Sequence, residues 1–136
     1  MGAFKEGGRW NSAGTYMLYT SENSSLAYLE NLVYFEPDNV PPNLYIMRMT
    51  LKAEAGLIYT LPNASYPNNW MEKESLENKL LGDQLMAERK YVAIQIRSAV
   101  NPYEFNIILN PLFPGYHDLI EIDAVEKLHI DTRLLK

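Results

Sequence analysis

The residues of this sequence that best suit chemistry are an arginine, a tyrosine, a glutamate and a serine. Arg9 follows Gly7-Gly8 and precedes Trp10. A guanidinium in such a loop can donate paired hydrogen bonds to a phosphate, and glycines let the backbone approach closely. The alternative, which composition alone favours, is a solvated arginine stacked on the tryptophan. Tyr19 could offer its ring to a flat heterocycle, although a tyrosine in a strand is more often half-buried packing.

Glu30 and Ser98 complete this set. Glu30 adjoins the apolar positions of a predicted helix, where a carboxylate is either a boundary residue, the commoner case, or a group kept for its charge. Ser98 closes a predicted strand in phase with Ile94 and Ile96, which predicts that its hydroxyl faces inward. A buried hydroxyl usually hydrogen-bonds to backbone. Each residue therefore has both a structural and a functional interpretation.

Other catalytic and metal-binding signatures are missing from the sequence. The lack of cysteine excludes a disulfide framework, a thiolate metal site and a cysteine nucleophile. The two adjacent glycines lack the context of a dinucleotide or phosphate-binding loop. Four residues near the C-terminus could supply metal ligands, but their spacing matches no defined site: His117, Asp118, Glu121 and Asp123. We interpret them as a solvated acidic turn and expect no metal.

Hydrophobic periodicity predicts the elements that must position these residues. Short strands are expected at 16–20, 45–51, 57–61, 92–98, 105–109, 119–122 and 127–130. A helix after the first strand has apolar positions at Leu26, Leu29 and Val33 and ends at Pro37. Its capping residue is expected to be Ser21, Asn23 or Ser24. One or two helices are expected across 74–88, with Gly82 as a break. Strands interrupted irregularly by helices indicate a single α+β domain.

Composition narrows the class of protein. The chain has 136 residues, 47% of them apolar and 21% charged, as in one soluble globular domain. A net charge of −5 argues against wrapping a nucleic acid but leaves room for a small anionic ligand. No apolar run approaches the ~20 residues that cross a bilayer, and the first residues lack the apolar segment of a secretory signal. We expect a cytoplasmic protein that binds neither nucleic acid nor membrane directly.

Taken in order, these features resemble the RES domain family, whose name records an arginine, a glutamate and a serine. The resemblance maps these three to Arg9, Glu30 and Ser98. The segments that carry it are Gly7-Gly8-Arg9-Trp10-Asn11, Tyr19-Thr20-Ser21, Leu26-Ala27-Tyr28-Leu29-Glu30, Arg97-Ser98-Ala99-Val100 and Asn106-Ile107-Ile108-Leu109-Asn110-Pro111. No single segment is specific, but the ordered set is.

The sequence departs from the family pattern at two places. The family usually has a histidine shortly after the Asn-Pro pair, where this chain has Leu112-Phe113-Pro114. Family members also usually begin with a Tyr-Arg strand well before the Gly-Gly-Arg-Trp loop, whereas eight residues precede Arg9 here. We therefore expect residues 1–136 to form one RES domain that lacks this first strand. A chain shortened in this way can fold and still be impaired in catalysis.

The resemblance implies a fold similar to ADP-ribosyltransferases, with short strands in a split sheet and flanking helices. It also implies a toxin of a type II toxin–antitoxin pair, neutralised by an Xre-type helix-turn-helix antitoxin. The activity it implies is the consumption of NAD+ by cleavage of the nicotinamide–ribose bond, with water, phosphate or a protein side chain as acceptor. The alternative is a catalytically impaired nucleotide- or partner-binding module of the same fold, and a homodimer is left open.

The resemblance also implies a role for each site residue. Cleavage of the nicotinamide–ribose bond develops oxocarbenium character, which a preorganised carboxylate stabilises, and this is the role implied for Glu30. Arg9 would neutralise the pyrophosphate and Tyr19 would pack on the nicotinamide or ribose. Ser98 would position the substrate or Glu30. NAD+ is thus the expected substrate, and no step requires a metal.

Overall fold

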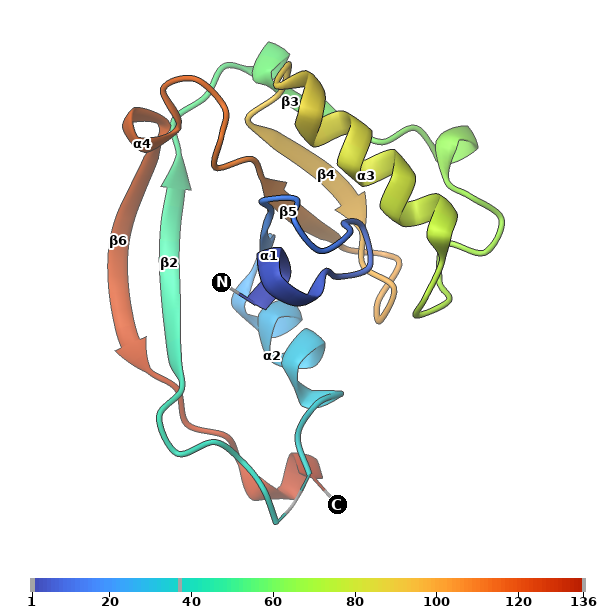
Figure 1. The fold of residues 1–136 in the computed structure, drawn as a ribbon. Coiled ribbons are helices and arrows are strands. Elements are labelled where there is room, and N and C mark those ends of the chain that lie inside the picture. Colours follow the sequence, from blue (N-terminus) through green and yellow to red (C-terminus); the bar gives the residue numbers. More distant parts are fainter. Residues whose placement is uncertain (1, 37, 136) are drawn as a thin grey trace.

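Two β-sheets of different size organise the chain (Figure 1). A computed structural model describes residues 2–36 and 38–135. Within them, one sheet, here called the main sheet, has the strand order β1-β5-β4-β3, and a separate ladder pairs β2 with β6. The strands are β1 (Leu18–Ser21), β2 (Tyr45–Leu51), β3 (Ile58–Thr60), β4 (Ala93–Arg97), β5 (Phe105–Leu109) and β6 (Ile120–Lys127). The helices are α1 (Gly2–Glu6), α2 (Ser24–Leu32), α3 (Leu76–Glu88) and α4 (Tyr116–Leu119). The predicted α+β class and split sheet are confirmed.

The main sheet is built around β4, whose residues are the most buried. Ile94 and Ile96 are each 1% exposed, and with Ile108 of β5 and Met86 of α3 they surround Trp10 in one core. β4 pairs antiparallel with β5 but parallel with β3. A parallel pair needs a crossover connection, and α3 is part of the segment that joins β3 to β4. Figure 1 shows α3 running along these two strands.

Helix α3 is continuous, so the predicted break at Gly82 is wrong. Ser75 caps its first turn by accepting a hydrogen bond from the Asn78 backbone N–H at 3.3 Å. Gly82 lies in the middle of the helix, where the backbone of Trp10 packs directly against it. The glycine therefore serves a close approach between two segments of backbone and does not end the helix.

One end of the β2–β6 ladder packs on the main sheet, on the face opposite to α3. Apolar residues from both sheets meet there: Met49, Leu51, Ile120, Val92, Ala93 and Leu109. Farther along the ladder, Tyr45, Met47 and Val125 are 61%, 48% and 54% exposed. Figure 1 shows the two long strands standing to one side of the rest of the chain. The ladder is thus supported at one end.

Helix α2 forms as predicted, but its apolar stripe does not. The Asn23 side chain caps it by accepting from the Leu26 backbone N–H at 2.8 Å. Leu26 is 1% exposed, whereas Leu29 and Val33 are 38% and 60% exposed. The first turn of the helix reaches the core, and the later turns border an open cleft. Pro37, expected to end the helix, lies outside the described residues.

The predicted strands agree with the structure to within about two residues except at the C-terminal end. The two short strands expected at 119–122 and 127–130 are a single strand, β6, and residues 128–130 are not in a strand. β2 offers partners along its whole length, from Leu51 opposite Ile120 to Tyr45 opposite Lys127. Because of this pairing, residues 123–126 continue the strand although their own sequence shows no clear apolar alternation. None of the helices among the described residues is long and apolar enough to cross a bilayer.

Candidate active site

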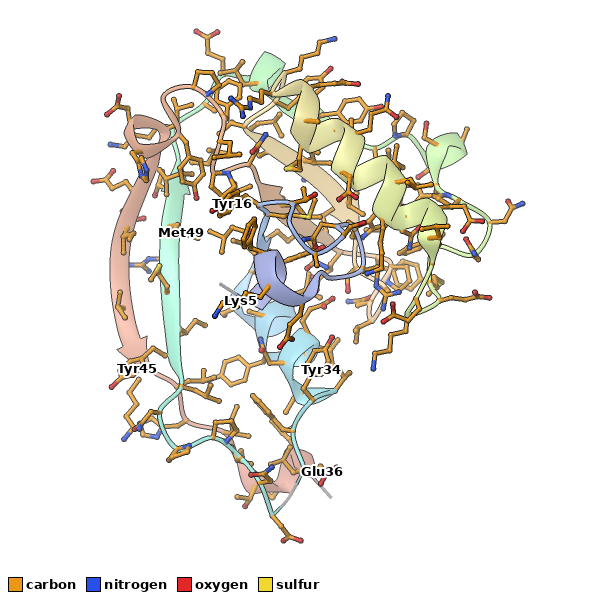
Figure 2. The ribbon with its side chains drawn as sticks, in the orientation of Figure 1. Lys5, Tyr16, Tyr34, Glu36, Tyr45 and Met49 are labelled. Carbon is orange, nitrogen blue, oxygen red and sulfur yellow. The ribbon has the colours of Figure 1, made fainter. Side chains whose placement is uncertain are left out.

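A cleft of about 1350 Å³ opens between the main sheet and the β2–β6 ladder. Its walls come from the loop around Arg9, from β1 with Tyr19, from α2 with Glu30, and from both strands of the ladder. Figure 2 shows Tyr45 and Met49 on the ladder side and Tyr34, just beyond α2, on the other. Three of the four residues singled out from the sequence therefore line one cleft. The fourth, Ser98, is fully buried behind Glu30.

Glu30 is half-buried on α2, and its carboxylate is anchored through one oxygen. Among the residues that the structure describes, two side chains donate to Oε1: the Ser98 hydroxyl and the Asn106 amide, the latter at 3.2 Å. Within the same residues, no hydrogen bond reaches Oε2. The carboxylate, at the wall of the cleft, is thus held in one orientation through a single oxygen.

Ser98 is oriented by the turn that follows β4. Its oxygen accepts hydrogen bonds from the backbone N–H groups of Val100 and Asn101 at 3.1 and 3.0 Å. Because these bonds occupy the lone pairs of the hydroxyl, its proton is directed to Glu30. The predicted inward phase is correct, since Ser98 is 0% exposed. Its partners are both the backbone, as the structural interpretation expected, and a carboxylate.

Arg9 is half-buried in the cleft wall and is tethered to a neighbouring loop. Its Nη1 donates to the carbonyl oxygens of Trp70 and Glu72 at 3.3 and 2.8 Å. Trp10 points away into the core, 3% exposed, and stacks there on Trp70. The stacking of Arg9 on Trp10, the structural alternative, therefore does not form.

Tyr19 holds the loop that carries Arg9. Its hydroxyl accepts from the Trp10 backbone N–H at 3.0 Å and donates to Asn11 Oδ1 at 2.7 Å. Burial raises the pKa of Tyr19 well above its ordinary value, and the hydrogen bond from Trp10 offsets this in part. Gly8 lies over the ring, because a Cβ built there would come within 2.8 Å of the hydroxyl. The tyrosine therefore fixes the loop and also lines the cleft.

The same loop is also held from α3. Lys79 donates through Nζ to the Gly8 carbonyl at 2.5 Å, and Asp83 accepts from the Ser12 backbone N–H at 2.9 Å. Lys79 and Lys73 line the cleft beside Arg9 together with Glu6 and Glu74, and Glu74 lies 3.9 Å from Lys79, so three cations face two carboxylates at this end of the cleft. Among residues 2–36 and 38–135, no group of three or more histidine, aspartate or glutamate side chains is arranged to hold a metal ion.

Comparison with known proteins identifies the family. The profile described as RES domain matches residues 1–131. The chain belongs to the RES domain family. Among its relatives, "Toxin Res" of Photorhabdus laumondii is 29% identical over 136 residues, 99% of this chain and 86% of the relative. "Prs ADP-ribosylating toxin" of Sphingobium is 27% identical and covers 99% of this chain and 84% of its own length. "Toxin Res" of Pseudomonas putida is 26% identical over 83% of this chain and 77% of the relative.

Sequence reasoning missed part of the polar framework of this RES domain. Asn106 and Ser21, which form a chain of hydrogen bonds behind Glu30, appeared in the segments that carry the resemblance but received no role. Asn11, which is also in one of those segments, and Lys79 and Asp83 of α3 hold the arginine loop and likewise received no role. The paired positions of Asn106 on β5 and Ser21 on β1 were a usable signal, but only once the strand pairing was known.

Proposed function

We propose that this RES domain protein is a toxin that consumes NAD+ by breaking the bond between nicotinamide and ribose. The observation that supports this most is the anchored carboxylate of Glu30 at the wall of a cleft large enough for a dinucleotide. The family assignment and the three relatives named as toxins support it independently.

The chemistry assigned to Glu30 is electrostatic. As the bond between the ribose C1′ and the nicotinamide nitrogen breaks, its electron pair leaves with the nicotinamide, and positive charge develops on the ribose. A carboxylate already in place opposite this charge stabilises the transition state without reorganisation. An acceptor oxygen then bonds to C1′ and releases its proton. The charge that Glu30 supplies is thus needed only while the ribose is cationic.

The negative pyrophosphate is assigned to the basic end of the cleft. Arg9, Lys73 and Lys79 lie there, and a guanidinium can bind phosphate oxygens with a fixed geometry. The contacts from Nη1 to two backbone carbonyls hold Arg9 in the wall, which lowers the entropic cost of binding. This end of the cleft would place the dinucleotide so that its nicotinamide ribose points toward Glu30.

Tyr19 and Ser98 are assigned supporting roles. The Tyr19 ring lines the cleft and is proposed to pack on the nicotinamide or ribose, while its hydroxyl keeps the arginine loop in place. Ser98 is fully buried, so the proposal assigns it to the positioning of Glu30 rather than of substrate. No metal is needed in this scheme.

The acceptor of the ADP-ribose is proposed to be a protein side chain. The name of the Sphingobium relative, an ADP-ribosylating toxin, favours transfer to protein over transfer to water or phosphate. A toxin that depletes or uses NAD+ must be neutralised in the cell that makes it. We therefore place this protein in the cytoplasm, paired with a helix-turn-helix antitoxin of the Xre type.

The test is a direct assay. The purified protein is incubated with NAD+ alone, with phosphate, or with a cell lysate, and free nicotinamide and the ADP-ribosyl products are measured. Release of nicotinamide supports the proposal, and the medium that accelerates release identifies the acceptor. Saturable binding of NAD+ without release supports the alternative, a binding module of the same fold. Absence of both binding and release contradicts the proposed function.

A further inference from the structure

The second donor to Glu30 belongs to a hydrogen-bonded chain that starts on the edge strand of the main sheet. Ser21 of β1 donates through Oγ to Asn106 Oδ1 at 3.2 Å. Asn106 of β5 donates through Nδ2 to Glu30 Oε1, also at 3.2 Å. Asn106 is half-buried and lines the cleft together with Ser21 and Glu30.

Strand register places the first two members of this chain together. Ser21 and Asn106 are directly opposite each other in the antiparallel pair of β1 and β5, so their side chains lie on the same face of the sheet. After two connecting residues, β1 is followed by α2, which carries Glu30. The strand pairing and this short connection bring the three side chains together.

The Glu30 carboxylate determines which end of the Asn106 amide faces it. An amide has a donor end and an acceptor end, and an ionised carboxylate can only accept. When Ser21 donates to Oδ1, the Nδ2 donor is directed at Glu30. With the amide reversed, an amide oxygen would lie against a carboxylate oxygen, whereas the Ser21 hydroxyl, which both donates and accepts, would keep a hydrogen bond. The carboxylate thus selects the orientation of the amide, and Ser21 adds a hydrogen bond to its Oδ1.

We propose that Asn106 is a positioning residue for the Glu30 carboxylate and that Ser21 supports it by a hydrogen bond to the Oδ1 of its amide. The proposal rests on the role assigned to Glu30 under the proposed function. Together with Ser98, Asn106 holds Oε1 from two directions, which restrains rotation of the carboxylate at the wall of the cleft.

A purely structural asparagine in the same strand region looks different. Asn110, directly after β5, is 1% exposed and makes its contacts to backbone, donating to the Met86 carbonyl and accepting from the Leu112 N–H. The contacts of Asn106 are with two side chains at the edge of the cleft. Asn106 is therefore placed to position another side chain, whereas Asn110 stabilises the backbone of a turn.

The chain also contains a matched control outside the cleft. Ser75 donates to Asn69 Oδ1 at 3.0 Å, and Asn69 donates through Nδ2 to Glu77 Oε2 at 3.1 Å. This is the same serine–asparagine–glutamate order with nearly the same distances, and Asn69 is half-buried like Asn106. The same substitution at Asn69 and at Asn106 shows whether the loss of activity follows from breaking any such hydrogen-bonded chain or from breaking the chain at Glu30.

The kinetic experiment compares Asn106→Ala, Asn106→Asp, Ser21→Ala and Asn69→Asp, each checked for an unchanged melting transition. We expect Asn106→Ala to lower kcat for nicotinamide release about 10- to 100-fold, as for a misplaced catalytic group, with the KM for NAD+ nearly unchanged. Asn106→Asp keeps the shape but replaces the donor with an acceptor, so its loss should be larger. Ser21→Ala should give a smaller loss of the same kind, and Asn69→Asp should leave kcat unchanged.

The proposal is decided by which of the two Asn106 variants, Asn106→Ala or Asn106→Asp, loses more kcat. If the side chain only fills space, the isosteric Asn106→Asp is the milder change, and this outcome overturns the proposal. In a double-mutant cycle, adding Asn106→Ala to Glu30→Gln should lower kcat little further, because the residue acts through Glu30. Equal effects in both backgrounds also overturn it.

A second readout does not depend on activity. The side-chain amide protons of Asn106, followed by ¹⁵N-edited NMR, should shift on Glu30→Gln and on Ser21→Ala, whereas those of Asn69 should not. If the unmodified protein releases no nicotinamide, the proposed function fails and this readout alone decides the present proposal. Amide resonances of Asn106 that ignore both substitutions overturn it, whatever the activity.

Discussion

The Cα of Gly82 faces the carbonyl of Trp10 so closely that a Cβ added to the glycine would lie 1.7 Å from the carbonyl oxygen. The contact joins the centre of α3 to the loop that carries Arg9. The neighbouring Asp83 holds the same loop through the Ser12 N–H. The geometry of the cleft wall thus depends on the absence of a side chain at Gly82, because α3 packs there against the loop that carries Arg9.

Gly82→Ala should therefore destabilise the protein, although alanine is the better helix former. Overpacking of this kind typically costs about 1–3 kcal/mol, more than the ~1 kcal/mol that alanine gains in a helix. Urea unfolding at neutral pH measures the difference. Gly56→Ala is the control, because a Cβ there meets nothing within 4 Å, and it should not destabilise. Equal midpoints for the Gly82 variant and the parent would contradict the close contact.

Glu30→Gln is expected to remove turnover while leaving binding nearly intact. The change keeps the shape of the side chain but removes the charge that stabilises the oxocarbenium-like transition state. The loss of one preorganised electrostatic contact lowers kcat about 10²–10³-fold, with little change in the KM for NAD+. The measurement is steady-state release of nicotinamide.

The control for this substitution is Glu77→Gln. Glu77 also accepts from an asparagine and a serine, but it lies outside the cleft. Its substitution should leave kcat unchanged. Parental turnover in Glu30→Gln would show that Glu30 is a boundary residue of α2 and that the proposed mechanism is wrong.

Arg9→Ala should weaken NAD+ binding as well as turnover. The substitution removes a cation from the basic end of the cleft and also the tether to the Trp70 and Glu72 carbonyls. We expect the KM to rise about tenfold or more, in line with the loss of a charged hydrogen bond of ~1.5–3 kcal/mol. Arg133→Ala, on an exposed arginine outside the cleft, is the control. A change in kcat alone would place Arg9 near the reacting bond rather than the pyrophosphate.

Tyr19→Phe should destabilise the arginine loop. The buried Trp10 N–H and Asn11 Oδ1 would each lose a partner, and an unsatisfied buried group costs about 1–3 kcal/mol. Because the ring remains, the effect reports the hydroxyl alone. Thermal unfolding measures the loss, and Tyr103→Phe, on a residue that is 91% exposed, should be neutral.

Tyr19 should also make stability fall at alkaline pH. Burial raises the pKa of Tyr19 in the folded protein, whereas in the unfolded chain it is about 10. As pH rises through this value the unfolded state loses its proton first, so the free energy of unfolding decreases. Urea midpoints measured from pH 8 upward should decline less steeply in Tyr19→Phe than in the parent. Parallel profiles would show that Tyr19 does not contribute.

Local patterns in the sequence predicted much of the fold. β5 was placed at its observed bounds because its run of apolar and β-branched residues is closed by Asn-Pro, and the phase of Ser98 followed from alternation along β4. What failed depends on partners far away in the chain. The length of β6 is determined by β2, and the need for Gly82 is determined by the loop at Trp10.

The candidate site shows the same division. Residue types and order indicated Arg9, Tyr19, Glu30 and Ser98, and the structure brings these residues to one cleft or directly behind it. Asn106 received no role because an asparagine in a strand carries no signal until its neighbours across the sheet are known. Only the pairing of β1 with β5 shows that it stands between Ser21 and Glu30.

The support of the β2–β6 ladder at one end has a consequence for the exchange of backbone amide hydrogens with solvent. Residues near Leu51 and Ile120 pack on the main sheet, whereas those near Tyr45 and Val125 are exposed. Local opening is easiest where few apolar contacts must break. Deuterium uptake along the ladder should therefore be graded, slow at Leu51 and fast at Tyr45, while β4 and β5 stay protected.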